Sequence, residues 1–301
     1  MNFLNRHLLN DFNLKKYEFF TILETNNKNK KLSYFNKKIC IINEKQSLRT
    51  INSLINVFQF LNLKFTIINN KHNFKKENIK DFSKTIGLLY DYIFVRNSND
   101  IIIKLIAKYS GSIVINLLNN GFHPIQSIGD ISLLKTNEII YFFGDFNSNV
   151  FRSIIINISK INKIIVMFSP KIYWNYIFLK KIFNKKKIII TEKIIITKKK
   201  CLIYNDVWFS MGENGNFLNK INNFINFQIN KKIFKILKIK KIFHCLPCYK
   251  NIKIKNKFFQ SELKENVFES NFSFFYKQIN KKTFVIKSYI ILGEKSFFKV
   301  I

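Results

Sequence analysis

Two short segments contain the residues of this chain that are best suited to chemistry. Residues 206–214 read DVWFSMGEN and residues 244–248 read HCLPC, so a carboxylate, Asp206, and a thiol, Cys245, each lie in a loop-like stretch. Ser-Met-Gly-Glu does not build a packed strand, and a Pro two residues after Cys245 disfavours a following helix. A neighbouring carboxylate disfavours the thiolate, so we expect Cys245 to position a ligand rather than to attack it.

Residues 44–50 (EKQSLRT) have the composition of an anion site. Ser47, Arg49 and Thr50 follow an apolar run directly and begin a segment with a helical pattern. The free amides and the dipole at a helix N-terminus attract anions, and Ser, Arg and Thr side chains add donors. The alternative is an ordinary helix cap beside a surface arginine.

Residues 122–130 (FHPIQSIGD) indicate a second group of donors. His123 precedes a Pro, which disfavours the helical conformation, and Gln126 falls in the first turn beyond it. Both side chains can therefore face one small ligand. A single His is usually structural, but its spacing to Gln126 and Asp130 favours a ligand site, with Asp130 supporting the loop.

The elements that must position these residues follow from the apolar pattern. Short runs rich in β-branched and aromatic residues alternate with longer mixed segments, which is typical of βαβ units and parallel sheets. Candidate site residues fall at the carboxyl ends of the predicted strands, where open α/β sheets bind ligands. The predicted strands are 37–43, 65–68, 92–96, 111–116, 138–145, 163–169, 187–191, 201–206 and 241–247.

The length of 301 residues suits two domains of about 150 residues each. Residues 120–135 separate the two series of strands and begin a helix that links the domains. Residues 275–292 are apolar at helical spacing. We therefore predict an α/β fold of two domains, each with a mainly parallel sheet flanked by helices.

The charge of the chain is strongly positive, with 51 Lys and Arg against 18 Asp and Glu and a net charge of +33. Such an excess can attract a polyanion. The basic residues are almost all Lys, however, and they accompany an excess of Ile, Asn and Phe that is typical of drift towards A and T codons. No Cys/His finger spacing occurs, so we predict no specific nucleic-acid partner and keep DNA binding as the lesser alternative.

The remaining sequence features predict a protein without a membrane partner, a metal or a cofactor. No apolar run approaches the roughly 20 residues of a membrane helix, and the first 13 residues lack the features of a signal peptide, so we expect the cytoplasm. Cys40, Cys201, Cys245 and Cys248 do not form a disulfide framework. Cys245 and Cys248 form a C-x-x-C, but without a second such pair we expect no zinc.

Taken together, these motifs resemble the aspartate/ornithine transcarbamoylase family, and within it the ornithine carbamoyltransferases. The segment at Ser47 resembles the S-T-R-T-R signature, HPIQSIGD matches H-P-x-Q-x-x-x-D, and HCLP stands unchanged. The resemblance implies a carbamoyl phosphate-binding domain at 1–130, an ornithine-binding domain at 131–274, and a C-terminal helix at 275–301 that packs back on the first domain.

The resemblance implies that Ser47, Arg49 and Thr50 hold the phosphate of carbamoyl phosphate. Leu48 can donate its backbone amide, although it has no hydroxyl. Ile51 stands where the signature has its second Arg, so one cation is lost and we expect weaker affinity.

The carbamoyl group has its own implied residues. Arg96 and His123 polarise the carbamoyl oxygen as preorganised donors, Gln126 holds the carbamoyl amine, and the Leu246 carbonyl receives the carbamoyl nitrogen. Lys281 stands where the family has an Arg, so it keeps the charge without the planar fork.

Ornithine has implied residues in the second half of the chain. Asp206 accepts the α-ammonium, Asn149 holds the carboxylate end, Ser210 and Met211 belong to a loop that closes over the substrate, and the Cys245 thiol lies beside the attacking amine. The implied catalytic residues are Arg96, His123, Asp206 and Cys245. Cys248 stands where the family usually has Ala and is expected to be inert.

The implied activity is transfer of the carbamoyl group to the δ-amine of ornithine, which gives citrulline and phosphate in arginine biosynthesis. Two alternatives stay open: a carbamoyltransferase for putrescine or aspartate, and a catalytically decayed subunit that binds carbamoyl phosphate. The resemblance also implies a homotrimer, with residues 69–76 reaching a neighbouring subunit through His72.

Overall fold

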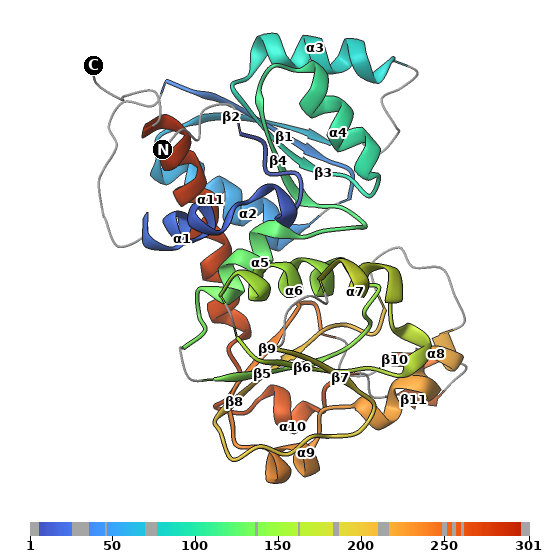
Figure 1. The fold of residues 1–301 in the computed structure, drawn as a ribbon. Helices are drawn as coiled ribbons and strands as arrows, with labels where there is room; N and C mark the ends of the chain where they lie inside the picture. Colours follow the sequence, from blue (N-terminus) through green and yellow to red (C-terminus); the bar gives the residue numbers. More distant parts are fainter. Residues whose placement is uncertain are drawn as a thin grey trace. The chain divides into compact units, whose positions relative to one another are not determined.

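The structure is a computed structural model that describes residues 6–25, 36–45, 47–69, 77–135, 138–161, 163–182, 187–209, 217–248, 252–254, 257–259 and 262–295. The chain divides into two compact units. Unit 1 comprises Met1–Ser132 and Ile279–Ile301, and unit 2 comprises Leu133–Gln278. Each unit contains a parallel sheet flanked by helices, which confirms the predicted α/β class (Figure 1).

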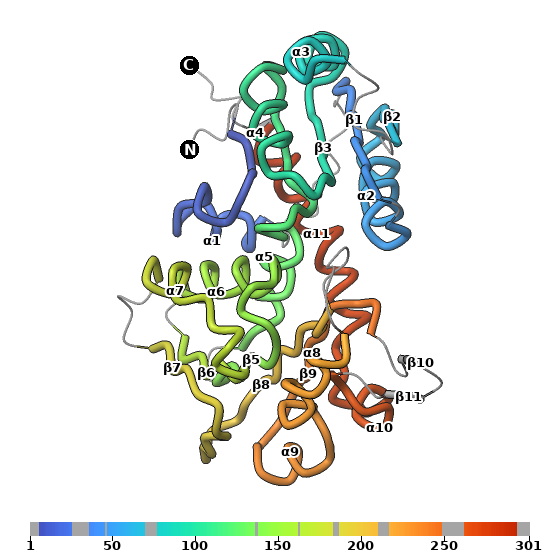
Figure 2. The backbone as a smooth tube through the Cα atoms, turned by 90° about the vertical axis from the view of Figure 1, so that its right-hand side faces the viewer, coloured from blue at the N-terminus to red at the C-terminus, as the bar shows by residue number. Residues whose placement is uncertain are grey.

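The sheet of unit 1 has the strand order β2-β1-β3-β4, and all neighbours are parallel (Figure 1). Figure 2 shows β1, β2 and β3 of this sheet from a second direction. The strands are β1 (Lys38–Asn43), β2 (Lys64–Asn69), β3 (Tyr92–Arg96) and β4 (Ile113–Leu118). The helices before, between and after them are η1 (Asp11–Asn13), α1 (Lys16–Thr25), α2 (Leu48–Phe60), α3 (Ile79–Leu89), α4 (Asp100–Tyr109) and α5 (Pro124–Ile131).

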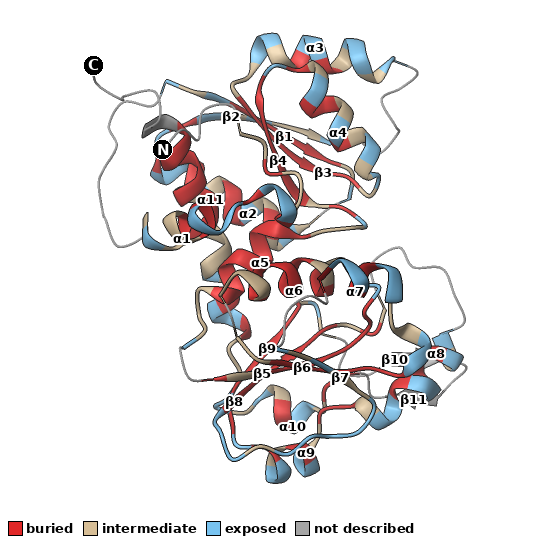
Figure 3. Cartoon of the chain, viewed as in Figure 1, coloured by how far each residue is buried: buried red, intermediate tan, exposed pale blue. Residues whose placement is uncertain are grey.

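Both faces of the unit 1 sheet are covered. On one face, Cys40, Ile93 and Val95 pack against Ile86 of α3 and Ile106 of α4. On the other face, Phe58 of α2 lies 5.3 Å from the ring of Phe94. In Figure 3 the buried colour follows β1, β3 and β4, whereas the exposed colour lies on the outer sides of α3 and α4. Burial on both faces explains the continuous apolar runs in these strands.

The sheet of unit 2 has the order β7-β6-β5-β8-β9 and is also parallel, and β10 and β11 form a separate antiparallel pair. The strands are β5 (Ile139–Phe143), β6 (Ile165–Phe168), β7 (Ile188–Thr191), β8 (Cys201–Asn205), β9 (Ile239–His244), β10 (Ile252–Ile254) and β11 (Lys257–Phe259). The helices are α6 (Asn149–Ile161), η3 (Lys171–Tyr173), α7 (Tyr176–Ile182), α8 (Phe217–Phe224), η4 (Ile225–Phe227), α9 (Lys231–Ile236) and α10 (Glu265–Phe268).

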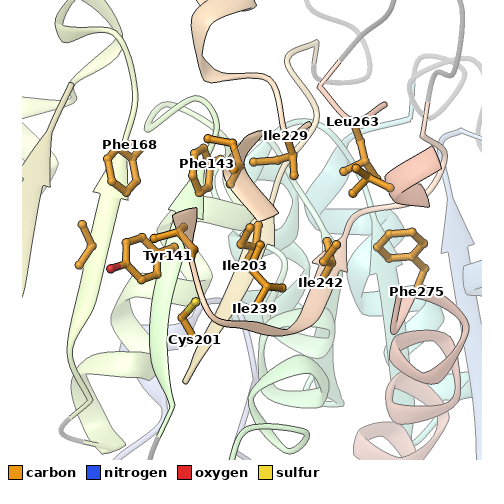
Figure 4. Packing of buried hydrophobic residues seen from close by; sticks show 14 residues of the cluster. Tyr141, Phe143, Phe168, Cys201, Ile203, Ile229, Ile239, Ile242, Leu263 and Phe275 are labelled. Atoms are coloured by element: carbon orange, nitrogen blue, oxygen red, sulfur yellow. The ribbon is translucent and has the colours of Figure 1, made fainter. Parts of the chain in front are cut away.

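Aromatic and branched side chains fill the core of unit 2. On one face, Tyr141, Phe143 and Ile203 pack with Leu263 and Phe275 (Figure 4). The other face carries a group of rings in which Phe151 of α6 lies 5.0 Å from Phe142 and 4.5 Å from Phe146. The alternation of side chains along β5 therefore sends successive aromatic residues into two different layers.

The C-terminal helix α11 (Phe275–Lys295) takes part in both units. Its first residues belong to unit 2, where Phe275 joins the apolar core. The rest belongs to unit 1, where the Tyr289 hydroxyl donates to the Arg6 carbonyl at 2.6 Å. A Cβ on Gly293 would lie 2.5 Å from the Tyr92 hydroxyl oxygen, so a glycine is needed there. The helix thus packs on the first domain as predicted.

Within the described part of the chain, no helix has the length and apolar character needed to cross a membrane. The predicted strands agree with the observed ones in each case to within a few residues, and the helix expected after Ser47 is α2.

Candidate functional site

The carboxyl ends of β1 and β3 form the switch point of unit 1. The chain leaves β1 for the edge strand β2 and then returns to β3 on the other side of β1. Open α/β sheets bind ligands at such points because the loops after adjacent strands diverge there. The Glu44 amide donates to the Arg96 carbonyl at 3.0 Å, which joins the two strand ends.

The first turn of α2 begins directly after β1. Ser47 is the N-cap, and its hydroxyl donates to the Thr50 hydroxyl at 3.0 Å instead of capping a backbone amide. The amides of the first helical turn have no partner within a helix, so Leu48, Arg49 and Thr50 can offer theirs to an anion. The Leu48 side chain is 76% exposed. It therefore adds no packing at this turn.

Arg96 ends β3 with an almost fully buried guanidinium, 3% exposed. Its Nε has no hydrogen-bond partner among the described residues. Burial lowers the pKa of Arg96, the positive charge of Arg49 lowers it further, and Glu44 raises it. The Glu44 carboxylate is already engaged, because it accepts from the Ser98 amide at 2.5 Å and from the Ser98 hydroxyl at 2.8 Å. Two neighbouring guanidiniums with one engaged carboxylate form a site for an anion.

His123 lies on the loop after β4 and immediately precedes α5. The Asn119 side-chain oxygen shapes this loop by accepting from the amides of Gly121 at 2.9 Å and Phe122 at 2.6 Å. Burial lowers the pKa of His123 well below 6.5, and the charges of Lys282 and Arg96 lower it further. The imidazole is therefore neutral near pH 7 and can donate from one nitrogen only.

The first turn and the body of α5 are buried, with Gln126 at 5% and Asp130 at 1% exposure. Pro124 occupies the first helical position, as its fixed backbone angle favours. Unit 1 therefore groups the predicted donors Arg96, His123 and Gln126 within buried segments at the carboxyl ends of β3 and β4.

The two adjacent lysines of α11 differ in their surroundings. The Lys281 ammonium lies 5.2 Å from the Phe284 ring, and its backbone lies against α5 at Gly129. The neighbouring Lys282 is the lysine whose charge acts on His123. Consecutive helical residues point about 100° apart, so the two lysines have different surroundings, and the role of Lys281 stays a prediction.

Unit 2 has its own switch point between β5 and β8. Asp206 follows β8 and is fully buried, and its amide donates to the Phe143 carbonyl at 2.9 Å. The next residue after β5 is Gly144, whose φ of +146° is one that side chains rarely adopt. A Cβ there would also lie 3.0 Å from the Asp206 Cβ. Gly144 thus lets the two strand ends approach closely.

Three donors surround the Asp206 carboxylate. The Ser148 hydroxyl donates at 2.5 Å, the Val207 amide donates at 2.9 Å, and the Cys245 thiol also donates. Burial raises the pKa of Asp206, while these hydrogen bonds and the charge of His244 oppose the rise. Because burial disfavours its charged form, a carboxylate of this kind gains from a cationic ligand, which favours that form.

Cys245 contacts two polar groups in unit 2. Its sulfur lies 3.6 Å from the Tyr204 hydroxyl and it hydrogen-bonds Asp206. The structure therefore brings together the carboxylate and the thiol that the sequence selected.

Leu246, the next residue, is partly buried against the unit 2 core. Ser210 and Met211 lie outside the described residues, as do 70–76 with His72.

Ser148 was not selected from the sequence, yet it has two roles at the start of α6. Its hydroxyl oxygen accepts from the Phe151 amide at 3.0 Å, as an N-cap does, while its proton goes to Asp206. Asn149, the predicted ornithine ligand, is the first residue of this helix and is partly buried. The sequence did contain one signal for Ser148: it stands three residues before Phe151, and a serine in that position often caps the N-terminus of a helix.

His244, Cys248 and Glu262 form a further cluster in unit 2 that sequence reasoning did not find. The His244 Nε2 lies 3.2 Å from a Glu262 carboxylate oxygen, and Cys248 lies beside them. Burial lowers the pKa of His244, but Cys248 and Glu262 outweigh it and raise the pKa to about 10. The spacing of Glu262 to the HCLPC segment gave no indication of this contact.

Comparison with known proteins gives a consistent family. Residues 6–136 match the family description "Aspartate/ornithine carbamoyltransferase, carbamoyl-P binding domain", and residues 137–292 match "Aspartate/ornithine carbamoyltransferase, Asp/Orn binding domain".

Individual relatives agree with this family. The chain is 31% identical over 284 residues to an ornithine carbamoyltransferase of Buchnera aphidicola subsp. Schizaphis graminum, covering 85% of this chain and 84% of that one. It is 32% identical over 222 residues to a catabolic ornithine carbamoyltransferase of Mycoplasma capricolum subsp. capripneumoniae, covering 66% and 71%. The crystal structure of the anabolic ornithine carbamoyltransferase of Campylobacter jejuni has the same fold, with a TM-score of 0.83, 23% identity and coverage of 96% and 99%.

Proposed function

The chain belongs to the aspartate/ornithine carbamoyltransferase family of enzymes that transfer carbamoyl groups, and from that premise we propose that it converts ornithine and carbamoyl phosphate into citrulline and phosphate. The amine lone pair forms a bond to the carbamoyl carbon, and the carbon–oxygen bond to phosphate breaks with its electron pair on phosphate. The amine loses one proton, which the departing phosphate can accept.

The observation that carries the choice of ornithine is the buried Asp206 carboxylate and the donors around it. This carboxylate is 0% exposed and lies at the switch point of unit 2, where an α-ammonium group would find its counter-charge. Aspartate as substrate would instead bring a second carboxylate that needs a cation. Putrescine has no carboxylate for Asn149 to hold.

The anion site of unit 1 supports carbamoyl phosphate as the second substrate. The Arg96 guanidinium is buried beside the charge of Arg49, and a phosphate group would neutralise both. We assign the phosphate to Ser47, Arg49, Thr50 and the Leu48 amide.

The carbamoyl group and ornithine receive the remaining assignments. Neutral His123 and Arg96 act on the carbamoyl oxygen as donors, because negative charge grows there in the transition state. Cys245 positions the amine as a thiol rather than forming a covalent bond, since it donates its proton to Asp206. The other assigned residues are Gln126, Leu246 and Lys281 for the carbamoyl end, and Asn149, Ser210 and Met211 for ornithine.

A colorimetric citrulline assay with purified protein tests the proposal. Product should form with ornithine, and neither putrescine nor aspartate should replace it. Arg96→Ala and Cys245→Ala should each lower kcat/KM by at least about tenfold, which corresponds to about 1.4 kcal/mol. Cys248→Ala is the matched control, because it removes the other thiol of the same segment, and it should leave kcat/KM within about twofold.

Two outcomes would contradict the proposal. Product with aspartate or putrescine but none with ornithine would assign another substrate. Turnover that is indifferent to both Arg96→Ala and Cys245→Ala would remove these side chains from the reaction, and absence of all turnover would favour the decayed binding subunit.

We propose that the reaction runs towards citrulline, in arginine biosynthesis in the cytoplasm. Relatives include anabolic and catabolic enzymes, so direction needs its own test. Expression in a bacterium that lacks ornithine carbamoyltransferase should restore growth without arginine. Failure to restore growth, together with phosphorolysis of citrulline by the purified protein, would assign the catabolic direction.

We also propose a homotrimer, on the strength of the family resemblance. Sedimentation should give three times the chain mass of 36.0 kDa. An active species that sediments as a monomer would contradict it.

A further inference from the structure

Three side chains with metal-binding atoms converge in unit 2 beside the groups assigned to ornithine. The ligand atoms of His244, Cys248 and Glu262 all lie within 4.8 Å of one another. They come from the end of β9, from the turn that follows it, and from the segment before α10. The His244 and Glu262 side chains are both 0% exposed, and Cys248 is partly buried.

The hydrogen bonds of His244 determine which nitrogen faces the cluster. Its Nδ1 lies 2.6 Å from the Cys245 carbonyl oxygen, so this nitrogen carries the proton and donates it. Its backbone amide donates to the Gln278 side chain at 3.0 Å, which fixes the residue further. Nε2 is then the nitrogen that faces Glu262, and it is the one that would lose its proton to bind a metal. A histidine whose second nitrogen donates to a carbonyl is the usual form of a metal ligand.

The atoms that face the interior of this cluster lack hydrogen bonds. Among the described residues, the His244 Nε2 and both carboxylate oxygens of Glu262 have no hydrogen-bond partner, although 3.2 Å separates Nε2 from Oε1. Without an ion, a proton on His244 supplies the positive charge beside the carboxylate and the sulfur, which is why the pKa of His244 is raised to about 10. A divalent cation between the three groups would take the place of that proton, because metal ligands bind in their deprotonated forms.

We propose that His244, Cys248 and Glu262 bind a divalent transition metal of the Zn²⁺ class. Nitrogen, thiolate sulfur and carboxylate oxygen are the ligands that Zn²⁺ takes. Bonds of about 2.0–2.3 Å place tetrahedral ligand atoms about 3.3–3.8 Å apart, which the 3.2 Å separation already approaches. The two negative ligands balance the charge of the ion, so the occupied cluster is neutral.

This proposal departs from the expectation that the chain binds no metal and that Cys248 is inert. That expectation required a second C-x-x-C, whereas the structure supplies the third ligand as a carboxylate from another segment. Cys245 is not part of the cluster, because its thiol donates to Asp206. The metal site and the group assigned to ornithine therefore use different thiols of the HCLPC segment.

Titration of the purified full-length chain with Co²⁺, followed by Zn²⁺, tests the site without any substrate. The wild type should bind a single Co²⁺ per chain with a thiolate-to-cobalt charge-transfer band, and Zn²⁺ should abolish that band. Cys248→Ala should lose the band and bind Zn²⁺ at least about tenfold more weakly, since even outer-shell changes cost about 10–100-fold. Cys245→Ala is the matched control and should keep both properties.

Circular dichroism would establish that each variant is folded, and Cys248→Ser provides a second test because serine keeps the size of the side chain without the soft sulfur. Absence of the band in the wild type would overturn the proposal. So would a band that persists in folded Cys248→Ala or Cys248→Ser, or a band that disappears in Cys245→Ala. Because the readout is metal binding, it is independent of whether the chain makes citrulline.

Discussion

The Ser148 hydroxyl lies 2.5 Å from the Asp206 carboxylate, across 58 residues of chain. One residue follows β5 and the other follows β8, the two strands at the switch point of unit 2. The same hydroxyl accepts from the Phe151 amide at 3.0 Å. The start of α6 and the buried carboxylate are therefore held by a single side chain.

Substitution Ser148→Ala should affect both stability and substrate use. Loss of the cap should lower the free energy of unfolding by about 1 kcal/mol. Loss of the donor leaves Asp206 with one fewer hydrogen bond and should lower kcat/KM for ornithine by about tenfold. Urea unfolding and the citrulline assay measure the two effects.

Ser159→Ala is the matched control, because Ser159 lies in the same helix and its hydroxyl donates to the Ile156 carbonyl at 2.6 Å. It should change neither quantity by more than about 0.5 kcal/mol. Equal effects of the two substitutions on kcat/KM would show that the Ser148 contact with Asp206 has no specific role.

Inorganic phosphate should stabilise the folded protein, because it would lie between the charges of Arg49 and Arg96. At about 100 times its Kd, a bound ligand adds about 2.7 kcal/mol to the free energy of unfolding. In Arg49→Gln this phosphate-dependent increase should be largely lost, while the protein without phosphate should be no less stable, since a like-charge repulsion has gone. Tm measured with phosphate and with chloride at equal ionic strength tests this.

The control for charge alone is Lys84→Gln, an exposed position on α3. It should keep the full phosphate effect on Tm. An increase in Tm that survives in Arg49→Gln would mean that phosphate binds elsewhere.

His123 should make stability depend on pH below its ordinary pKa of 6.5. Burial and the nearby positive charges lower the pKa in the folded state, so the unfolded chain takes up a proton that the folded chain does not. The folded state therefore loses stability as the pH falls from above 6.5 towards the lowered pKa. Because a single proton is involved, the loss from this residue is at most about 1.4 kcal/mol for each pH unit below 6.5.

The matched variant is His123→Asn, which cannot take up a proton. Urea unfolding at about pH 8 and about pH 5.5 should show a smaller decrease for this variant than for the wild type. Identical pH profiles for the two proteins would contradict the assignment of a neutral, buried imidazole.

Gly129 should be intolerant of a side chain, because a Cβ there would lie 3.0 Å from the Lys281 carbonyl carbon and oxygen. Gly129→Ala should lower the free energy of unfolding by about 1–3 kcal/mol by forcing α5 and α11 apart. Gly121→Ala is the control, since its nearest contact is 3.4 Å to the Asn119 side chain. Similar losses in both variants would indicate that the α5–α11 approach is not limiting.

The sequence predicted the sheets well because their inner strands are buried on both faces and read as continuous apolar runs. Residues 92–96 and 201–206, for example, correspond to β3 and β8. Arg96 and Asp206, which the motifs and the family resemblance had selected, lie at the ends of these strands, where such sheets bind ligands.

The contacts that the sequence did not predict depend on tertiary structure. Glu262 meets His244 only because the segment before α10, which pairs with the chain at Ile229, comes close to the end of β9, and no spacing rule encodes that. Lys281 and Lys282 are chemically identical neighbours, so only the phase of α11 distinguishes the lysine that acts on His123. Ser148 resembles any helix cap until β8 brings Asp206 beside it.

The helix α11 has a consequence for how the protein is made. Its later residues complete the packing of unit 1, with Ile290 fully buried, although the rest of that unit lies before Leu133. A nascent chain on the ribosome therefore exposes the apolar surface that awaits this helix until α11 itself has been translated. The N-terminal unit begins synthesis first but finishes folding last, and the gene cannot be cut at the domain boundary into two self-sufficient products.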